Sequence, residues 1–290
     1  METEGDVELR QVISASRRTD IPMHFSPWLA AAVVQGHVEV PQPYSGRVRS
    51  VSLRPEDVHS FVLWSKDFQP LLQDAGGART ALARYDQVFC HLTLTGLGGT
   101  RVEPSIRPWR EVACQLPELI EFAGDARRVV VRYDPIVHWY EGGQVQSNLS
   151  LAEPILQVVS EAGLSTVIVS FATLYGKVLK RKGWRWYDPT VEEKQEIAAR
   201  LLRTTSSLGL TLSACSQAAL QATGIEPSRC IDGELLSRLH PLALPAAKDK
   251  DLGQRPECGC TRSVDIGSYL MRCPNGCRYC YANPLIPPAA

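Results

Sequence analysis

The sequence predicts an α/β fold, a complete or partial TIM-like βα barrel built on a parallel sheet. Short apolar runs rich in β-branched residues alternate along the chain with stretches that have helical periodicity. Six such runs fit a barrel or partial barrel better than a short open sheet. Polar residues also gather where these runs end, as they do at the ligand-binding edge of parallel βα folds.

The predicted strands and helices follow one another in a regular order. The strands are residues 12–16, 61–64, 88–95, 128–133, 166–171 and 210–214, with a seventh expected at 263–269. The helices are residues 117–122, 152–162 and 191–208. Because the runs are apolar throughout, we expect a sheet that is buried on both faces.

Composition and charge exclude some classes of protein. The 290 residues contain 31 Lys or Arg and 31 Asp or Glu, so the net charge is zero and no nucleic-acid partner is expected. The densest basic stretch, residues 177–185, is interpreted either as a solvated face or as a phosphate-binding segment. The start of the chain is acidic and polar, and no apolar stretch has the length of a membrane span, so we expect a cytoplasmic protein without membrane contact.

The nine cysteines are unevenly distributed. Cys90 and Cys114 stand alone and are predicted to be core residues, whereas the other seven lie between positions 215 and 280. In a reducing compartment, clustered thiols indicate metal ligands rather than disulfides.

The spacing of the last three cysteines indicates an iron–sulfur site. Cys273, Cys277 and Cys280 form C-x3-C-x2-C around a Pro-Asn-Gly turn. Three thiolates on a 4Fe–4S cluster leave one iron open to a substrate or cofactor. The alternative is a zinc site whose fourth ligand comes from Cys258, Cys260 or a histidine.

A second set consists of Cys215, Cys230, Cys258 and Cys260. All four can bind an auxiliary 4Fe–4S cluster, or three of them can do so with one iron open. Four thiolates also suit tetrahedral zinc, and Cys215 alone can be an ordinary buried thiol.

The C-terminal motif, with Tyr279 before its last cysteine, resembles that of radical S-adenosylmethionine (radical SAM) enzymes. Segments 13–22, 52–57, 132–135, 230–233, 254–256 and 280–283 resemble the DUF1848 family. The resemblance implies a circularly permuted radical SAM fold with S-adenosylmethionine as cofactor and Tyr279 near its adenine. It implies three regions: a barrel body at 1–212, an auxiliary-cluster region at 213–262, and a permuted strand with the cluster loop at 263–290.

In the permuted fold that the resemblance implies, the strand at 12–16 takes the position of the strand that normally follows the cysteine loop. The residues predicted to hold the methionine moiety are therefore Ser14, Ser16, Arg17, Arg18 and Asp20. A guanidinium binds a carboxylate with two hydrogen bonds, which suits Arg17 or Arg18. A salt bridge to Asp20 is the alternative role for these arginines.

A small-molecule substrate, with a nucleoside or nucleotide as one candidate, is expected at the mouth of the barrel. Arg132, Asp134, Tyr175 and Lys177 are the predicted contacts, with Arg132 and Lys177 for phosphate and Asp134 for sugar hydroxyls. The layout also resembles albomycin-type thionucleoside biosynthesis, in which a ribose ring oxygen is exchanged for sulfur; this implies that the auxiliary cluster donates sulfur. A flavodoxin or ferredoxin is the expected electron donor.

Two other classes of function remain open from the sequence. A zinc-stabilised structural or nucleic-acid-binding module predicts a basic face around the cysteines, which the neutral composition does not favour. A two-cluster electron carrier needs neither a large βα scaffold nor an open iron.

Overall fold

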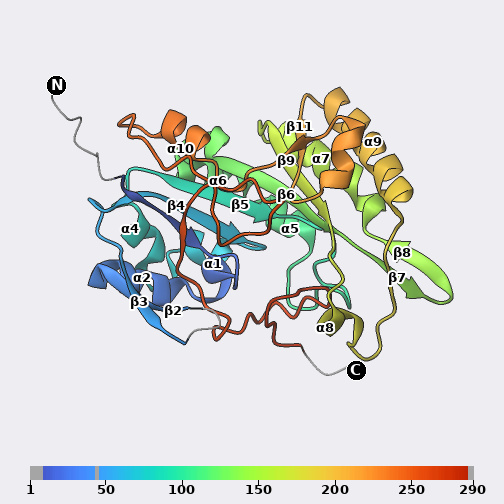
Figure 1. Ribbon diagram of the computed structural model, residues 1–290, viewed down its shortest axis with the longest axis horizontal. Coiled ribbons are helices and arrows are strands. Elements are labelled where there is room, and N and C mark those ends of the chain that lie inside the picture. Colours follow the sequence, from blue (N-terminus) through green and yellow to red (C-terminus); the bar gives the residue numbers. More distant parts are fainter. Residues whose placement is uncertain (1–8, 43–45, 287–290) are drawn as a thin grey trace.

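A parallel sheet runs through the molecule (Figure 1). The computed structural model describes residues 9–42 and 46–286, and within them this sheet has eight strands. They are β1 (Gln11–Ala15), β4 (Val58–Ser65), β5 (Val88–Thr93), β6 (Val129–Ile136), β9 (Thr166–Phe171), β11 (Thr211–Ala214), β12 (Glu226–Pro227) and β13 (Val264–Asp265).

The spatial order of the strands is β12-β11-β9-β6-β5-β4-β1-β13. Chain order and spatial order agree except at β13, the last strand, which lies parallel to the first with Ile13 opposite Val264 and Ser14 opposite Asp265. Because all the neighbours are parallel, the segments after β13, β1, β4 and β5 all leave the same edge of the sheet. The C-terminal cysteine loop is one of these segments.

The prediction of an α/β fold with a parallel sheet is confirmed. Each of the six strands predicted from apolar runs corresponds to a strand of the sheet. The seventh is shorter than predicted and comprises only Val264–Asp265; beyond it the backbone passes close to β1 at Gly267, where an added Cβ would lie 2.0 Å from the Ser16 hydroxyl oxygen. Closure of the sheet into a barrel stays a prediction. The ends of the first and last predicted regions, 1–8 and 287–290, lie outside the described residues.

Helices lie in the segments that connect the strands. The α-helices are α1 (Ile21–His24), α2 (Ser26–Gln35), α3 (Gln69–Leu72), α4 (Ala78–Leu82), α5 (Trp109–Ala113), α6 (Leu116–Ala123), α7 (Ala152–Glu161), α8 (Gly176–Leu179), α9 (Val191–Ser207) and α10 (Gly233–Leu239). The three predicted helices correspond to α6, α7 and α9. A capping box between Thr190 and Glu193 fixes the start of α9.

Two smaller sheets and several 3₁₀ turns accompany the parallel sheet in the described residues. A two-stranded sheet pairs β2 (His37–Pro41) with β3 (Val48–Ser52), and a three-stranded sheet joins β10 (Trp186–Tyr187), β7 (His138–Glu141) and β8 (Gln144–Ser147). The 3₁₀ turns are η1 (Ala75–Gly77), η2 (Ala126–Arg128), η3 (Leu149–Leu151) and η4 (Ala218–Thr223). Among the described residues, no helix combines the length and apolarity needed to cross a membrane.

Alternate residues of the strands enter two separate cores. Ile13, Phe61 and Tyr133 belong to the larger core with the helices, whereas Val62 and Val130 on the opposite face pack against the segment that carries Cys230 and Cys260. Both faces are therefore buried, as the continuous apolar runs predicted.

The two solitary cysteines behave differently from each other. Cys90 on β5 is fully buried, as predicted. The prediction of a core position for Cys114 is wrong. Cys114 follows α5 on the exposed side of the helix, where its thiol donates to the carbonyl of Arg110.

Candidate functional site

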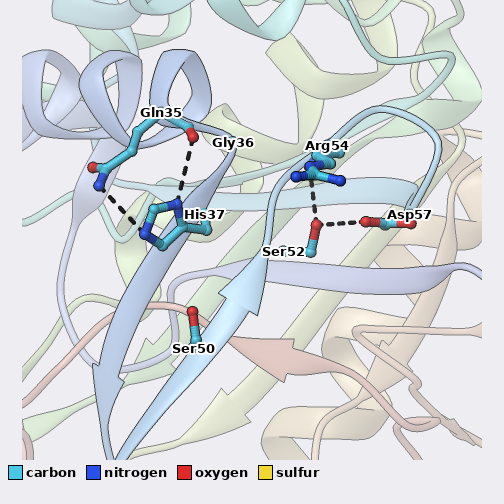
Figure 2. A pocket seen from close by; sticks show the side chains of 7 residues that line it. All are labelled: Gln35, Gly36, His37, Ser50, Ser52, Arg54 and Asp57. Atoms are coloured by element: carbon cyan, nitrogen blue, oxygen red, sulfur yellow. Dashed lines mark hydrogen bonds between the residues drawn. The ribbon is translucent and has the colours of Figure 1, made fainter.

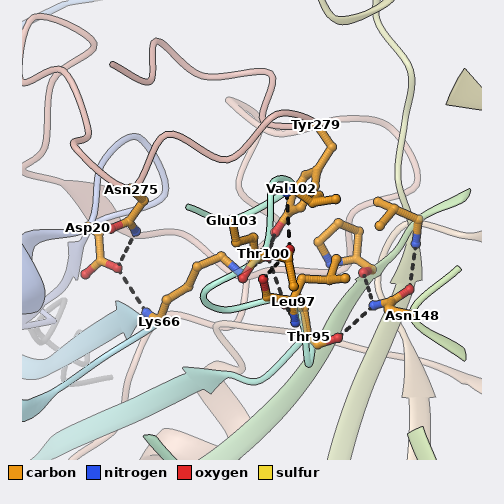
Figure 3. A network of polar contacts seen from close by, with 12 residues as sticks. Asp20, Lys66, Thr95, Leu97, Thr100, Val102, Glu103, Asn148, Asn275 and Tyr279 are labelled. Atoms are coloured by element: carbon orange, nitrogen blue, oxygen red, sulfur yellow. Dashed lines mark hydrogen bonds and ion pairs between the residues drawn. The ribbon is translucent and has the colours of Figure 1, made fainter. Parts of the chain in front are cut away.

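The three-cysteine loop, residues 273–280, lies at the carboxyl edge of the sheet. It follows β13 and contacts the segments that follow β1, β4 and β5, through Asp20, Lys66 and Glu103 respectively (Figure 3). These segments are far apart in the sequence, and the parallel topology brings them to one place.

A buried charge network holds the second half of the loop. The Lys66 Nζ lies 2.9 Å from Glu103 Oε1, and the Tyr279 hydroxyl donates to the same carboxylate oxygen, as does the Thr95 hydroxyl at 2.8 Å. The side chain of Glu103 is 1% exposed and that of Lys66 is 13% exposed. Burial lowers the pKa of Lys66, but the charge of Glu103, with smaller effects of Cys277 and of the hydrogen bond to Glu103, outweighs it and raises this pKa overall.

Asp20 holds the first half of the loop. Its Oδ2 accepts from the Asn275 side-chain amide at 3.0 Å and from the Lys66 backbone N–H at 2.9 Å. Its Oδ1 accepts from the Ser65 hydroxyl and from the backbone N–H of Met23, so the same carboxylate also caps α1. Asp20 therefore joins the ends of β1 and β4 to the cysteine loop.

Arg181 ties the outer side of the loop to α8. Its guanidinium donates to the backbone carbonyls of Cys277 at 3.3 Å, of Arg278, and of Cys280 at 2.6 Å. Gly276 adopts a positive φ of 65°, which a glycine accommodates without strain. The loop is thus fixed from both sides.

The three thiols of the loop are free and close to one another. Burial, followed by the charge of Glu103, raises the pKa of Cys277, on which the charges of Cys280 and Cys273 also act. Burial, followed by the charge of Asp20, raises the pKa of Cys273 to about 12. Cys277 and Tyr279 pack in an apolar cluster with Leu97, Val102, Val137, Val178 and Trp186, so water has little access to this side of the loop.

The structure also brings together the four cysteines of the predicted second set. Cys215, at the end of β11, has its sulfur 3.6 Å from that of Cys230, and Cys230, Cys260 and Cys258 lie near enough to shift one another's pKa values. The hydrogen bond from Cys260 lowers the pKa of Cys258 to about 6, so this thiol is largely ionised at neutral pH.

Two arginines lie beside this second set. Arg132 on β6 donates from Nη1 to the Cys230 sulfur at 2.7 Å, and its other nitrogens bind the Asp134 carboxylate. Arg17 lies within reach of the charges of Cys260 and Cys230, and its guanidinium stands 5.5 Å above the ring of Trp64. Both cations lower the pKa values of the thiols beside them, but burial and the neighbouring sulfurs leave the pKa values of Cys230 and Cys260 raised overall.

The described residues contain no group of three or more His, Cys, Asp or Glu side chains arranged around a point that would suit a single metal ion. In an iron–sulfur cubane, each cysteine binds a different iron.

The residues predicted to hold the methionine moiety have protein partners. Ser14 and Ser16 donate to the Asp265 carboxylate at 2.8 and 2.7 Å, and Arg17 pairs with Asp251 at 3.6 Å. The Arg18 guanidinium donates to the carbonyl of residue 267 at 2.8 Å. The alternative of a salt bridge from Arg17 or Arg18 to Asp20 does not occur among the described residues, because Asp20 faces Asn275.

The predicted substrate contacts fall into two pairs rather than one group. Arg132 and Asp134 lie beside the four-cysteine set, where Asp134 also accepts from Ser170. Tyr175 packs against Tyr281, with ring centroids 5.5 Å apart, and Lys177 acts electrostatically on Cys280, so this second pair lies at the three-cysteine loop. The charge of Asp134 acts on Cys215 in the four-cysteine set and on Lys66, which lies beside the three-cysteine loop.

Several residues that fix the site were not among the site residues predicted from the sequence. Lys66, Glu103, Asn275, Arg181 and Asp265 carry most of its polar contacts. Lys66 stands two residues after the predicted strand at 61–64, which was a usable signal. Glu103 lies in a long loop beyond β5, and nothing in its sequence context separates it from a surface glutamate.

A pocket lies away from both cysteine sets. It has a volume of about 400 Å³ and is formed by the β2–β3 hairpin and its surroundings (Figure 2). Its polar side chains bind one another, as in the 2.5 Å contact between Ser52 and Asp57. None of the predicted site residues lines it; the lining residues are Gln35, Gly36, His37, Ser50, Ser52, Arg54 and Asp57.

A protein-family model matches most of the chain. The family model described as "Domain of unknown function (DUF1848)" matches residues 12–282, which include both cysteine sets and nearly the whole sheet. The chain matches no curated protein.

Proposed function

We propose that this chain, which belongs to the DUF1848 family, is a radical SAM enzyme whose 4Fe–4S cluster is held by Cys273, Cys277 and Cys280. The observation that carries the proposal is the position of the loop. Three free thiols follow a strand of a parallel sheet at its carboxyl edge, and a buried polar network fixes them from both sides. Ligands of parallel α/β folds bind at this edge.

The position of β13 supports a circularly permuted radical SAM barrel. β13 pairs with β1, so the strand that carries the cysteine loop stands in space before the first strand of the chain. The sheet then reads β13, β1, β4, β5, β6, β9, with each strand parallel to the next. We propose that this sheet is the incomplete barrel expected from the sequence.

The residues around the loop fit an anionic cluster. A cubane with three thiolate ligands carries negative charge, and the Lys66 ammonium and the Arg181 guanidinium both lie at the loop. Thiolates and sulfides also gain from a dry, hydrogen-bonded surrounding, which the apolar cluster around Cys277 provides. When bound, the cluster supplies the electron that splits S-adenosylmethionine into methionine and a 5′-deoxyadenosyl radical.

The chain's own residues position the reactants and exclude water. Arg18 reaches from the end of β1 to residue 267, on the segment that leads into the cysteines, and we retain it as the partner for the methionine carboxylate. Ser14, Ser16 and Asp20 do not contact the methionine moiety themselves in this proposal. The two serines hold Asp265 in place, and Asp20 holds Asn275. Tyr279 stays protonated, because burial and the nearby Glu103 raise its pKa well above 10.

A second 4Fe–4S cluster is proposed on Cys215, Cys230, Cys258 and Cys260. Arg132 and Arg17 offset the charge of these thiolates, and Trp64 and His91 form a stacked pair beside them, with centroids 5.1 Å apart. Asp134 binds Arg132 beside the four-cysteine set, and its charge also acts on Lys66 at the three-cysteine loop, so we place the substrate between the two sets, with Arg132 and Asp134 as contacts. Exchange of ring oxygen for sulfur stays a prediction; a sacrificial cluster would lose sulfide during one turnover.

Metal analysis of anaerobically purified protein tests the proposal. About eight irons and eight sulfides are expected in the wild type, and about four irons fewer after replacement of Cys273, Cys277 and Cys280 together by alanine. The Cys215/Cys230/Cys258/Cys260→Ala variant should lose the other four irons, and Cys114→Ala, at an exposed thiol, should lose none. Stoichiometric zinc in place of iron would instead favour a structural zinc protein.

A further inference from the structure

We propose that the exposed surface around α8 docks an acidic one-electron carrier protein that reduces the cluster. This α8 surface consists of Lys177, Leu179, Lys180, Lys182 and Tyr281, all of which are exposed. The inference rests on the proposed function, because a cluster that cleaves S-adenosylmethionine must receive each electron from outside the chain.

The α8 surface is attached directly to the three-cysteine loop. Arg181, in the turn after α8, donates to the carbonyls of Cys277 and Cys280, and Tyr175 before α8 packs on Tyr281 directly after the last cysteine. Figure 1 shows α8 beside the C-terminal segment at the edge of the molecule. A protein that covers this surface therefore lies next to the predicted redox centre.

The charge of this surface is strongly asymmetric. Residues 173–187 contain five Lys or Arg and no acidic residue, and residues 266–290 contain two Arg and no acidic residue, in a chain whose net charge is zero. Lys180 and Lys182 form no ion pair within the described parts of the chain. Lys177 lies near enough to Cys280 for its charge to act on the thiolate. Such a cationic patch steers anionic partners toward the loop.

Apolar side chains stand among these cations. Leu179 is 54% exposed, Tyr281 is 44% exposed, and Leu285, whose backbone N–H donates to the carbonyl of Cys273, is 41% exposed. An apolar centre with a charged rim is typical of protein interfaces, and electron-transfer complexes are at the small end of their size range. Exposed leucines contribute nothing to binding of a phosphate backbone, so the mixture favours a protein partner over a nucleic acid.

The reaction at this surface is a one-electron transfer. A partner flavin in the anionic hydroquinone form would give up one electron and become the neutral semiquinone, and a 4Fe–4S cluster held by the cysteine loop would accept that electron. No atom moves between the two proteins.

Reduced flavodoxin is the probe for the experiment. Its reoxidation by the fully reconstituted protein is followed anaerobically by stopped-flow absorbance, with 50 and 300 mM salt. The Lys180→Glu/Lys182→Glu variant should be reduced about tenfold more slowly at low salt and should show little salt dependence. Leu179→Ser should slow the transfer equally at both salt concentrations, because it removes an apolar contact.

The control is the Arg49→Glu/Arg203→Glu variant. It makes the same change in net charge at two exposed positions on β3 and α9, outside the α8 surface, and should match the wild type. Dithionite, a small reductant that needs no docking surface, should reduce all the variants alike, with equal iron contents.

Equal flavodoxin rates for the Lys180→Glu/Lys182→Glu variant and the wild type would overturn the docking inference while leaving the enzyme proposal intact. So would an unchanged rate combined with loss of binding to a single-stranded oligonucleotide, which would identify a nucleic-acid surface. A wild-type protein in which dithionite reduces no iron–sulfur centre would overturn the proposed function, and this inference with it.

Discussion

The ion pair between Lys66 and Glu103 allows a quantitative test of how the cysteine loop is held. In the Glu103→Gln variant the amide keeps the volume and can still accept from the Thr95 and Tyr279 hydroxyls, but the charge that compensates Lys66 is lost. Removal of one partner of a buried pair costs about 3–5 kcal/mol. Since the Lys66 side chain retains 13% exposure, we expect a loss near the lower end, about 3 kcal/mol.

The double variant separates the ion pair from other effects. Lys66→Met leaves the Glu103 carboxylate without its cation, whereas Lys66→Met/Glu103→Gln leaves no unpaired charge. The loss of unfolding free energy in the double variant should therefore be smaller than the sum of the losses in the two single variants, by at least about 2 kcal/mol. Arg101→Gln is the control, because its pair with Glu141 is exposed and should contribute less than about 1 kcal/mol.

The assay is urea unfolding of the metal-free protein under reducing conditions, followed by far-ultraviolet circular dichroism. Iron binding by the same variants is measured separately. Two results would refute the claim that this pair anchors the loop. One is a double variant whose loss of unfolding free energy equals the sum of the two single losses, and the other is a Glu103→Gln loss below about 1 kcal/mol.

Three further predictions concern the packing, pH response and outer contacts of the site. Gly267→Ala places a Cβ 2.0 Å from the Ser16 oxygen and should cost about 1–3 kcal/mol in urea unfolding, whereas Gly176→Ala meets nothing within 4 Å and should cost none. Burial lowers the pKa of His59, so below the unfolded value of about 6.5 the unfolded chain gains a proton that the folded chain does not; stability should fall between pH 7 and pH 5, and His59→Gln should flatten this slope. Arg181→Gln should lose iron faster to a chelator than the wild type, and an unchanged rate would show that its carbonyl contacts do not hold the loop.

The sheet was predictable because its strands are buried on both faces. Each of the long strands is an apolar run bounded by turn residues, and burial of alternate residues in two cores preserves that signal. The strand β12 has two residues, too few for any periodicity to be detected, and of the strand predicted at 263–269 only the two residues of β13 are extended. Their place in the sheet depends on tertiary contacts, such as the four hydrogen bonds that Asp265 accepts.

The cysteines were predictable from spacing, and their surroundings were not. C-x3-C-x2-C is local in sequence, so the loop is recognised without a structure. Glu103 reaches the loop only because β5 and β13 end at the same edge, and a single sequence does not reveal such a contact. Arg17 was assigned to the methionine moiety from its position after β1, yet its guanidinium lies over Trp64 beside the second cysteine set.

Formation of 5′-deoxyadenosine tests the central claim most directly. Reconstituted protein is incubated anaerobically with dithionite and S-adenosylmethionine, and 5′-deoxyadenosine and methionine are quantified by mass spectrometry beside the Cys273/Cys277/Cys280→Ala variant. We predict that the wild type forms both products in equal amounts and that the variant forms neither. A cluster-loaded wild type that is reduced by dithionite but forms no 5′-deoxyadenosine would contradict the proposal and would favour an electron carrier.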